Sequence, residues 1–223
     1  HGTTVATNTL LTLQGAKTAL ITTKGLRDAL EMRRGIREEQ YNNHYQNVTP
    51  LVPRSLRFTL DERIDSDGNV VTSINVDELE LLVEKINTEN VESIAICFMN
   101  SYLNNTHEKH VAKYLRKRLE NTFITASCEV LPSIRFYERV STTVVNAYIG
   151  VDVDSYIASL QEKLKELNFK GGFSIMQSNG GVVSPEVVRK IPAVTVLSGP
   201  AAAPIAGAYY AKMLGYDNCI TMD

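Results

Sequence analysis

The chain has 223 residues, of which 43% are hydrophobic and 22% are charged, as is typical of globular proteins and not of disordered ones. Its formal net charge of −2 excludes a strongly basic surface, so we expect neither a nucleic acid nor a membrane as a partner. The cysteines Cys97, Cys128 and Cys219 lack the spacing of a disulfide framework or a zinc site. We therefore expect a reducing compartment, the cytoplasm.

One uncharged stretch, residues 191–211, has the 21 residues that a bilayer span needs. Pro192, Gly199, Pro200 and Pro204 interrupt it, which suits a strand, a turn and a buried helix better than a membrane span. The chain starts at His1 without a charged-then-apolar leader, so we expect it to be an internal piece of a longer protein.

The first half of the chain alternates between helix and strand patterns. The Asp-Gly pair within Asp65–Asn69 predicts a tight hairpin. The polar stretch 33–47 is expected to form an exposed loop. Helices are expected over 3–13, 24–32, 75–87 and 105–119, and strands over 17–23, 54–64, 70–74, 92–100 and 123–128. Alternation on this scale predicts an α/β fold with a largely parallel sheet flanked by helices.

The second half is expected to open with two helices over Ser133–Leu167, broken near residues 150–152. Strands are expected at FSIMQ (173–177), AVTVL (193–197) and NCITMD (218–223), with a helix of small residues over 201–215. The Ala and Gly of that helix would let another segment pack closely against it. The carboxylate of Asp223 would then lie at the carboxyl edge of a sheet.

Two polar turns rich in glycine follow expected strands. One consists of Gln177, Ser178, Asn179, Gly180 and Gly181, and the other of Ser198, Gly199 and Pro200. Ligands of open α/β sheets bind beyond the carboxyl ends of the strands, where small residues let backbone amides approach an anion. Alternatively, these glycines only form tight turns.

Other candidate residues have simpler explanations. HGTT at residues 1–4 offers a hydrogen-bonding cluster, or a plain helix cap at Thr3 or Thr4. His107 and His110 in HEKH are expected on a solvated helix face rather than at a metal. Arg135, Glu138 and Arg139 are expected to form an ion-paired helix face, with a substrate or interdomain contact of Arg135 or Arg139 as the alternative. Cys97 and Cys128 are expected to be inert core thiols.

The helix of small residues, followed by a strand that ends in Asp223, resembles the actin-like ATPase superfamily. The resemblance extends to a family, because ordered blocks from one end of the chain to the other are similar to the hydantoinase A and oxoprolinase family. These blocks are HGTTVATNTLL, ALITTKGLRDALE, PLVPRSLRF, AICFMNSYLN, EVLPSIRFYERVSTTVVNAYIG, MQSNGG and LSGPAAAPIAGA. That family uses ATP to phosphorylate the oxygen of a cyclic amide or a ketone.

The resemblance implies an internal fragment of an actin-like (ribonuclease H-like) α/β fold. Residues 1–132 would be the remainder of the N-terminal domain, and 133–223 the start of the hydantoinase A core. Asp223 would hold Mg²⁺ and take part in catalysis with His1, Thr3 and Thr4. ATP would contact the two polar turns, which comprise Gln177, Ser178, Asn179, Gly180 and Gly181 and then Ser198, Gly199 and Pro200. The family's DxGGT-type loop and second glycine-rich phosphate loop do not occur in the chain.

The implied function is ATP-dependent hydrolysis of a cyclic amide such as a hydantoin or a lactam, with a hydantoinase B-type subunit or domain as the partner. Two alternatives stay open. One is a subunit of an ATP-dependent acetone or acetophenone carboxylase, which shares the ATP step. The other is a binding or scaffold module that has lost catalysis. Two intact glycine-rich phosphate loops in the whole protein would favour the enzyme, and their loss would favour the scaffold.

Overall fold

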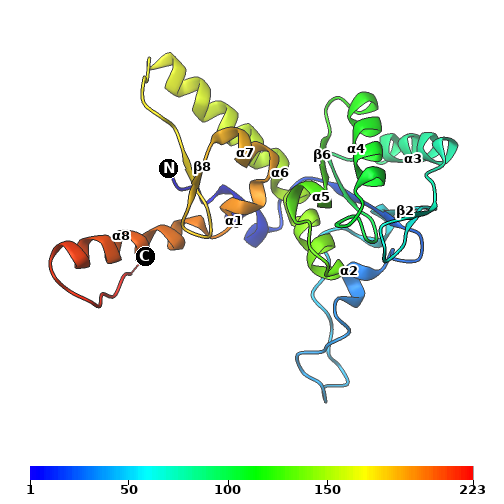
Figure 1. Ribbon diagram of the computed structural model, residues 1–223, viewed down its shortest axis with the longest axis horizontal. Helices are drawn as coiled ribbons and strands as arrows, with labels where there is room; N and C mark the ends of the chain where they lie inside the picture. Colours follow the sequence, from blue (N-terminus) through cyan, green and yellow to red (C-terminus); the bar gives the residue numbers. More distant parts are fainter. Residues whose placement is uncertain (223) are drawn as a thin grey trace. The chain divides into compact units, whose positions relative to one another are not determined.

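The computed structural model describes residues 1–222, and its contacts divide the chain into two compact units. Unit 1 consists of His1–Gly15 together with residues 149–222, and unit 2 of Ala16–Tyr148. Figure 1 shows the elements of both units, with colours that follow the chain. The α/β class expected from the sequence is confirmed.

Unit 2 is built on a four-stranded sheet in the order β2-β1-β5-β6. The strands are β1 (Thr18–Thr23), β2 (Arg57–Leu60), β5 (Ser93–Cys97) and β6 (Phe123–Ala126). All three pairings are parallel, with Leu20 opposite Arg57 and Ala95, and Ile94 opposite Ile124. Every residue of β1 and β5 is buried, as expected for central strands that are covered on both faces.

Helices α3 (Val76–Thr88) and α4 (Thr106–Arg118) contact each other and pack on this sheet. Asn75 caps α3 by accepting a hydrogen bond from the Asp77 amide at 2.8 Å. The first turns of α6 (Phe136–Glu166) also reach the core of unit 2, where Val140, Val144 and Ala147 are buried. The short elements of unit 2 are α2 (Ala29–Met32), η1 (Arg54–Leu56) and α5 (Ser127–Val130).

The expected hairpin forms between β3 (Arg63–Ile64) and β4 (Val70–Thr72), which pair antiparallel. The Asp65 carboxylate accepts hydrogen bonds from the amides of Asp67 and Asn69, and Gly68 adopts φ +86°. A left-handed residue at this point requires glycine, so the Asp-Gly pair specifies the turn.

Unit 1 contains α1 (Val5–Thr12), the later turns of α6, and the strands β7 (Ile175–Met176) and β8 (Val182–Val183), which pair antiparallel. It also contains α7 (Pro185–Lys190), η2 (Pro192–Thr195) and α8 (Ser198–Met213). The Thr9 hydroxyl donates to the Asp152 carboxylate at 3.0 Å and so fixes α1 on α6.

The expected break near residues 150–152 is wrong, because α6 runs without interruption. A glycine inside a helix costs about 1 kcal/mol relative to alanine, which is too little to end a helix that packs well. Ile149 and Val153, on either side of Gly150, are both completely buried. Packing of these neighbours outweighs the local preference of Gly150.

Two expected strands are also wrong. AVTVL falls in the 3₁₀ helix η2 and the bend after it, and residues 218–222 form no regular structure. A short apolar run does not distinguish a strand from a helical turn, and Pro192 has the φ of a first helical position. Within residues 1–222 no helix is both long and apolar enough to cross a membrane.

Candidate functional site

The amino-terminal segment of unit 1 lies beside β7. The carbonyl of His1 accepts a hydrogen bond from the Met176 amide at 2.9 Å. The His1 Nε2 shares a second hydrogen bond of 2.9 Å with the hydroxyl of Tyr156, and the two rings are stacked with their centroids 6.0 Å apart. His1 is nevertheless exposed, so its ring is both held in place and accessible to a ligand.

The two threonines of HGTT differ in their surroundings. Thr3 is buried, and its hydroxyl oxygen accepts a hydrogen bond from the Val5 amide at 3.3 Å. Thr4 is exposed and occupies the cap position of α1, where its side chain makes no capping hydrogen bond. Of the pair, Thr4 therefore presents a hydroxyl that has no partner among residues 1–222, whereas Thr3 serves the start of α1.

The same segment contacts the start of α8. The Ser198 hydroxyl donates to the Thr3 carbonyl at 3.3 Å, and the Leu197 amide donates to the Thr7 hydroxyl at 3.0 Å. Leu197 adopts φ +59°, which is unusual for a residue with a branched side chain. The side chain of Ser198 is fully buried and is turned toward Thr3, so it is not available to a ligand.

Gly199 and Pro200 form the first turn of α8, which has no side-chain cap. A Cβ added to Gly199 would meet no atom within 4 Å. The backbone N–H groups of Ser198 and Gly199 carry the partial positive charge of a helix start, which suits an anion such as a phosphate, whereas Pro200 has no N–H to donate. The residues present thus fit a phosphate group at this end of α8.

The turn Gln177–Gly181 is closed by its own hydrogen bonds. The Gln177 amide donates to the Gly181 carbonyl at 2.8 Å, the Gly180 amide to the Gln177 carbonyl at 3.0 Å, and the Gly181 amide to the Asn179 side chain at 2.8 Å. The Ser178 amide and hydroxyl both donate to the carbonyl of Val194. With these four amides engaged, only the Asn179 amide of the turn has no partner within residues 1–222, and the turn offers mainly side chains to a ligand.

The close approach that small residues permit occurs at Gly180 and Gly207. Gly180 has φ +84°, and a Cβ there would lie 2.3 Å from the Cδ1 of Ile205 on α8. A Cβ on Gly207 would lie 2.2 Å from the Cγ2 of Thr221. The helix of small residues therefore packs against the polar turn at one point and against the segment after α8 at another.

Asp223, for which the sequence predicts the metal-binding and catalytic roles, lies outside the described residues. Across residues 1–222, no group of three or more His, Cys, Asp or Glu side chains has the arrangement of a metal site. The structure thus brings His1, Thr3 and Thr4 together with both polar turns in unit 1, and Asp223 stays a prediction.

A buried polar cluster in unit 2 was missed by the sequence reasoning. Glu108 is completely buried and accepts hydrogen bonds from the amides of Phe98 and Cys128 and from the Ser127 hydroxyl, all at 2.6–2.8 Å. The guanidinium of Arg139, also fully buried, lies 4.0 Å from Glu108 and donates to the Phe98 carbonyl at 2.9 Å. Arg139 therefore does not form the expected ion-paired helix face with Arg135 and Glu138, because it is buried beside Glu108.

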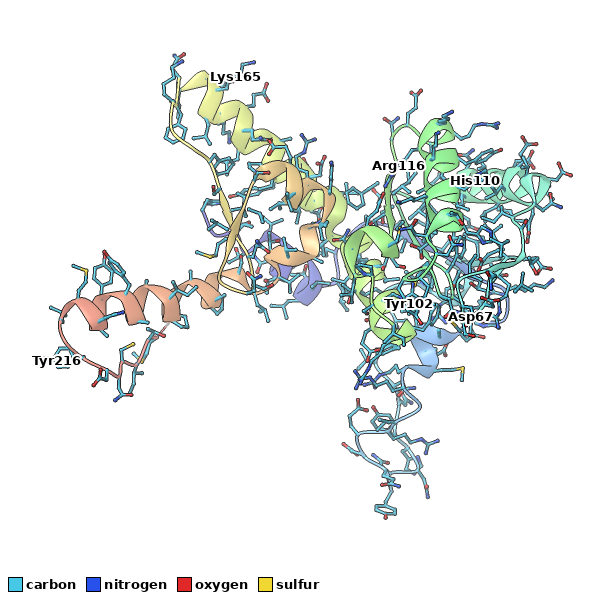
Figure 2. The ribbon with its side chains drawn as sticks, in the orientation of Figure 1. Asp67, Tyr102, His110, Arg116, Lys165 and Tyr216 are labelled. Atoms are coloured by element: carbon cyan, nitrogen blue, oxygen red, sulfur yellow. The ribbon has the colours of Figure 1, made fainter. Side chains whose placement is uncertain are left out.

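His107 belongs to a neighbouring buried contact. Its Nδ1 lies 2.7 Å from the carboxylate of Glu62, which is fully buried and also accepts from the Thr23 hydroxyl. The expected solvated face of HEKH is thus correct for His110, which is exposed and is labelled on α4 in Figure 2, and wrong for His107 and Glu108, which are buried. Glu108 shares the helical spacing of Val111, Ala112 and Leu115, and that spacing was the signal of its burial.

The thiols of unit 2 are poor nucleophiles. Burial, together with the nearby charge of Glu108, raises the pKa of Cys97 to about 12. The same two causes, in the same order, raise the pKa of Cys128 well above its ordinary value. This agrees with the expectation of inert core thiols.

Comparisons with known proteins identify relatives for the whole chain. The family model described as "Hydantoinase/oxoprolinase N-terminal region" matches residues 1–119, and the model "Hydantoinase/oxoprolinase" matches residues 139–223. The caprolactamase subunit alpha of Pseudomonas jessenii is 37% identical over all of this chain and 32% of its own length. The acetophenone carboxylase gamma subunit of Aromatoleum aromaticum is 30% identical, again over the whole chain and 32% of its own length.

The fold agrees with a solved structure. The crystal structure of the ATP-dependent caprolactamase from Pseudomonas jessenii superimposes with a TM-score of 0.88 at 36% identity, over 97% of this chain and 32% of that one. The chain thus spans about a third of the length of the relatives that it matches. Since the two family models together cover most of its residues, the chain belongs to the hydantoinase/oxoprolinase family.

Proposed function

We propose that the full-length protein uses ATP to phosphorylate the amide oxygen of a cyclic amide and so activates the ring for hydrolysis. Membership of the hydantoinase/oxoprolinase family supports this reaction class. The relationship to an ATP-dependent caprolactamase, a protein named for a cyclic amide, favours a lactam as the substrate.

The observation that carries the proposal is the meeting of three segments in unit 1. HGTT, the turn Gln177–Gly181 and the start of α8 lie far apart in the sequence. Hydrogen bonds join His1 to Met176 of β7, Thr3 to Ser198, and Ser178 to Val194 just before α8. The contact of Thr3 with Ser198 is buried, whereas His1, Ser178 and Asn179 stay exposed on these segments. A ligand can be held there by several groups at once.

In this proposal the start of α8 binds a phosphate of ATP. No side chain caps α8, so the N–H groups of Ser198 and Gly199 keep their partial positive charge, which favours an anion. The bound ATP supplies the phosphoryl group that turns the amide oxygen into a leaving group. Phosphoryl transfer needs mainly positioning and neutralisation of charge, which fixed backbone dipoles provide.

His1 and Thr4 are assigned to the substrate side of the site. The hydrogen bond and the stacking contact with Tyr156 hold the imidazole of His1 in one orientation while the ring stays exposed. The Thr4 hydroxyl has no capping role and is free to bond a polar ligand. Gln177 and Asn179 would contribute their side chains, because four of the five amides of their turn are engaged.

Magnesium is proposed at Asp223 on the resemblance to the family. A carboxylate oxygen is a ligand type that Mg²⁺ prefers. A second subunit or domain of the hydantoinase B type is proposed as the partner that completes ring opening. The names of the caprolactamase and carboxylase relatives, which are subunits, support a partner.

A second candidate is the activation of a ketone for carboxylation. The 30% identity to the acetophenone carboxylase gamma subunit over the whole chain favours it. Both reactions share phosphorylation of a carbonyl-type oxygen and differ in the acceptor that follows.

The test measures ADP release by the full-length protein with its partner subunit. Caprolactam, 5-oxoproline, hydantoin and acetophenone are compared, the last with and without bicarbonate. Stimulation by a cyclic amide alone supports the proposal, and stimulation only by the ketone with bicarbonate supports the second candidate. ATP turnover that none of the four stimulates contradicts both.

The metal assignment has its own variant. Asp223→Asn is expected to lower substrate-dependent ATP turnover by about a hundredfold or more, since neutralisation of charge at a metal–phosphate site contributes several kcal/mol. The exposed Asp217→Asn, nearby in the sequence, is the matched control and should keep full turnover. Equal turnover of the two variants would remove Asp223 from the mechanism.

A further inference from the structure

Unit 2 contains a pocket of about 350 Å³ between strand β2 and helix α3. None of its lining residues belongs to the candidate site of unit 1. Strand β2 is at one edge of the four-stranded sheet, so one side of it has no neighbouring strand within that sheet. The pocket is therefore a feature of unit 2 alone.

The pocket collects hydrogen-bond donors that lack partners. Lys85 lines it from α3, and its ammonium group makes no ion pair or hydrogen bond with any described residue. The hydroxyls of Ser55 and Thr59 also line it and are equally unengaged within residues 1–222. Arg27 also lines the pocket; its Nε is buried without a hydrogen-bond partner in the described chain, while its Nη2 donates to the Arg54 carbonyl at 2.8 Å.

Arg57 forms the buried base of the pocket, and its positive charge is already paired with two carboxylates. The Arg57 side chain is only 2% exposed, and its Nη1 lies 3.0 Å from Glu31 and 3.4 Å from Asp28. Asp28 is shared with Arg54, whose Nε lies 2.9 Å away. The carboxylates of this group are thus committed to Arg54 and Arg57, and they do not neutralise Lys85.

Asp28 and Glu31 lie behind the lining, whereas Glu78 is itself a lining residue and accepts hydrogen bonds from the Asp61 amide at 3.1 and 3.3 Å. The lining residues and the ion pairs that they form with Asp28 and Glu31 together contain four basic side chains and three carboxylates. Their net charge is therefore +1. The basic groups are Arg27, Arg54, Arg57 and Lys85, and the acidic ones are Asp28, Glu31 and Glu78. Phe58 and Leu81 add apolar wall.

We propose that this pocket binds a small organic anion that carries one carboxylate or phosphate group on an apolar body. The anionic group contacts Arg27 and Lys85 and accepts from the hydroxyls of Ser55 and Thr59. The apolar body packs on Phe58 and Leu81. A donor set with one unbalanced positive charge beside an apolar wall matches such a ligand better than a neutral or cationic one.

A different role for the same cations is protection of the sheet edge. Charged side chains on an edge strand prevent it from pairing with a strand of another chain. That role predicts self-association when the cations are removed, and it predicts no bound anion. The two roles therefore differ in what is measured.

Isothermal titration calorimetry on the full-length protein tests the proposal with three probes of similar shape. Benzoate and phenyl phosphate carry the anionic group, and benzamide is the neutral control. We expect binding of at least one anion and none of benzamide, and the benzoate and phenyl phosphate titrations distinguish a carboxylate from a phosphate ligand. Because the contacts are charge-assisted, the affinity should fall as salt is raised.

The variant Arg27→Gln/Lys85→Gln is expected to weaken anion binding on the order of tenfold, from the loss of two partly exposed charge contacts. Lys117→Gln on α4 is the matched control, because Lys117 is exposed and does not line the pocket. Lys85→Gln alone, at an exposed position, keeps the test decisive if the Arg27 substitution unfolds unit 2.

Three results would overturn the proposal. The first is benzamide binding as tightly as benzoate, and the second is undiminished anion binding by the Lys85→Gln variant. The third is the absence of binding by any probe to the wild-type protein. If that absence is joined by concentration-dependent association of the double variant on size exclusion, the cations protect the edge strand instead.

Discussion

At the scale of single residues, Arg139 shows how a charge can be part of a core. Its Nη1 donates to the Ser127 hydroxyl at 3.0 Å and to the Ser101 hydroxyl, and its guanidinium lies 5.6 Å from the ring of Tyr102, a residue labelled in Figure 2. Together with Glu108 it joins α4, α5 and α6 beyond the ends of β5 and β6. An isolated buried charge is costly, so each member of this cluster depends on the others.

Arg139→Met is expected to destabilise the protein by about 3–5 kcal/mol, because it leaves the Glu108 carboxylate buried without a cation. Urea unfolding followed by circular dichroism measures the change. Arg135→Met, one turn earlier and exposed, should change stability by less than about 0.5 kcal/mol. Similar midpoints for the two variants would mean that the cluster contributes no net stability.

Cysteine reactivity offers a second test at this scale. Because folding raises the thiol pKa of Cys97 to about 12 and also raises that of Cys128, neither forms thiolate near pH 8 in the folded state. Cys219 is exposed. A chromogenic disulfide reagent should therefore modify Cys219 quickly in the native protein and all three cysteines in denaturant. Rapid modification of Cys97 without denaturant would contradict its burial.

At the scale of elements, Gly180 and Gly199 separate two uses of glycine. At Gly180 the backbone has a left-handed φ, so any residue with a side chain would be strained there. At Gly199 a side chain would meet open space. Gly180→Ala should destabilise unit 1 by about 1–2 kcal/mol, and Gly199→Ala, in a helical turn, should be close to neutral. Thermal unfolding of the two variants measures the difference, and an equal loss would show that φ is not what requires glycine at residue 180.

Much of the secondary structure could be predicted, because its causes are local. Periodic apolar spacing located α1, α3 and α4, and continuous apolar runs located β1 and β5. The hairpin at Asp65–Asn69 followed from its Asp-Gly pair. The errors at Gly150 and AVTVL arose where packing or a proline outweighed a short pattern.

The candidate site was predictable in its parts and not in its contacts. The polar turns and HGTT stand out in the sequence, whereas the hydrogen bonds of Thr3 with Ser198 and of Thr7 with Leu197 join residues about 190 positions apart. Sequence spacing carries no information on such contacts. The burial of Glu108 was encoded in helical spacing, but the charge of its side chain favoured the opposite interpretation.

At the scale of the whole molecule, unit 2 has the properties of an independently folding domain. Its buried apolar residues, from Ala19 to Ala147, form one continuous core. A protein restricted to residues 16–148 should therefore unfold cooperatively. Within it, Leu115→Ala should cost about 2–5 kcal/mol, because Leu115 is completely buried. A broad, non-cooperative melt of residues 16–148 would show that unit 2 needs unit 1 in order to fold.

The backbone hydrogen bond from the Ala16 amide to the Tyr148 carbonyl, 3.0 Å long, bears on the order of folding. It joins the first and last residues of unit 2, which are also the points where the chain leaves and re-enters unit 1. Closing so long a loop costs about 4 kcal/mol of chain entropy. Once unit 2 has folded, that entropy is already lost, and the two segments of unit 1 meet as if they were neighbours along the chain. Unit 1 should therefore fold after unit 2, and a variant that unfolds unit 2 should unfold unit 1 with it.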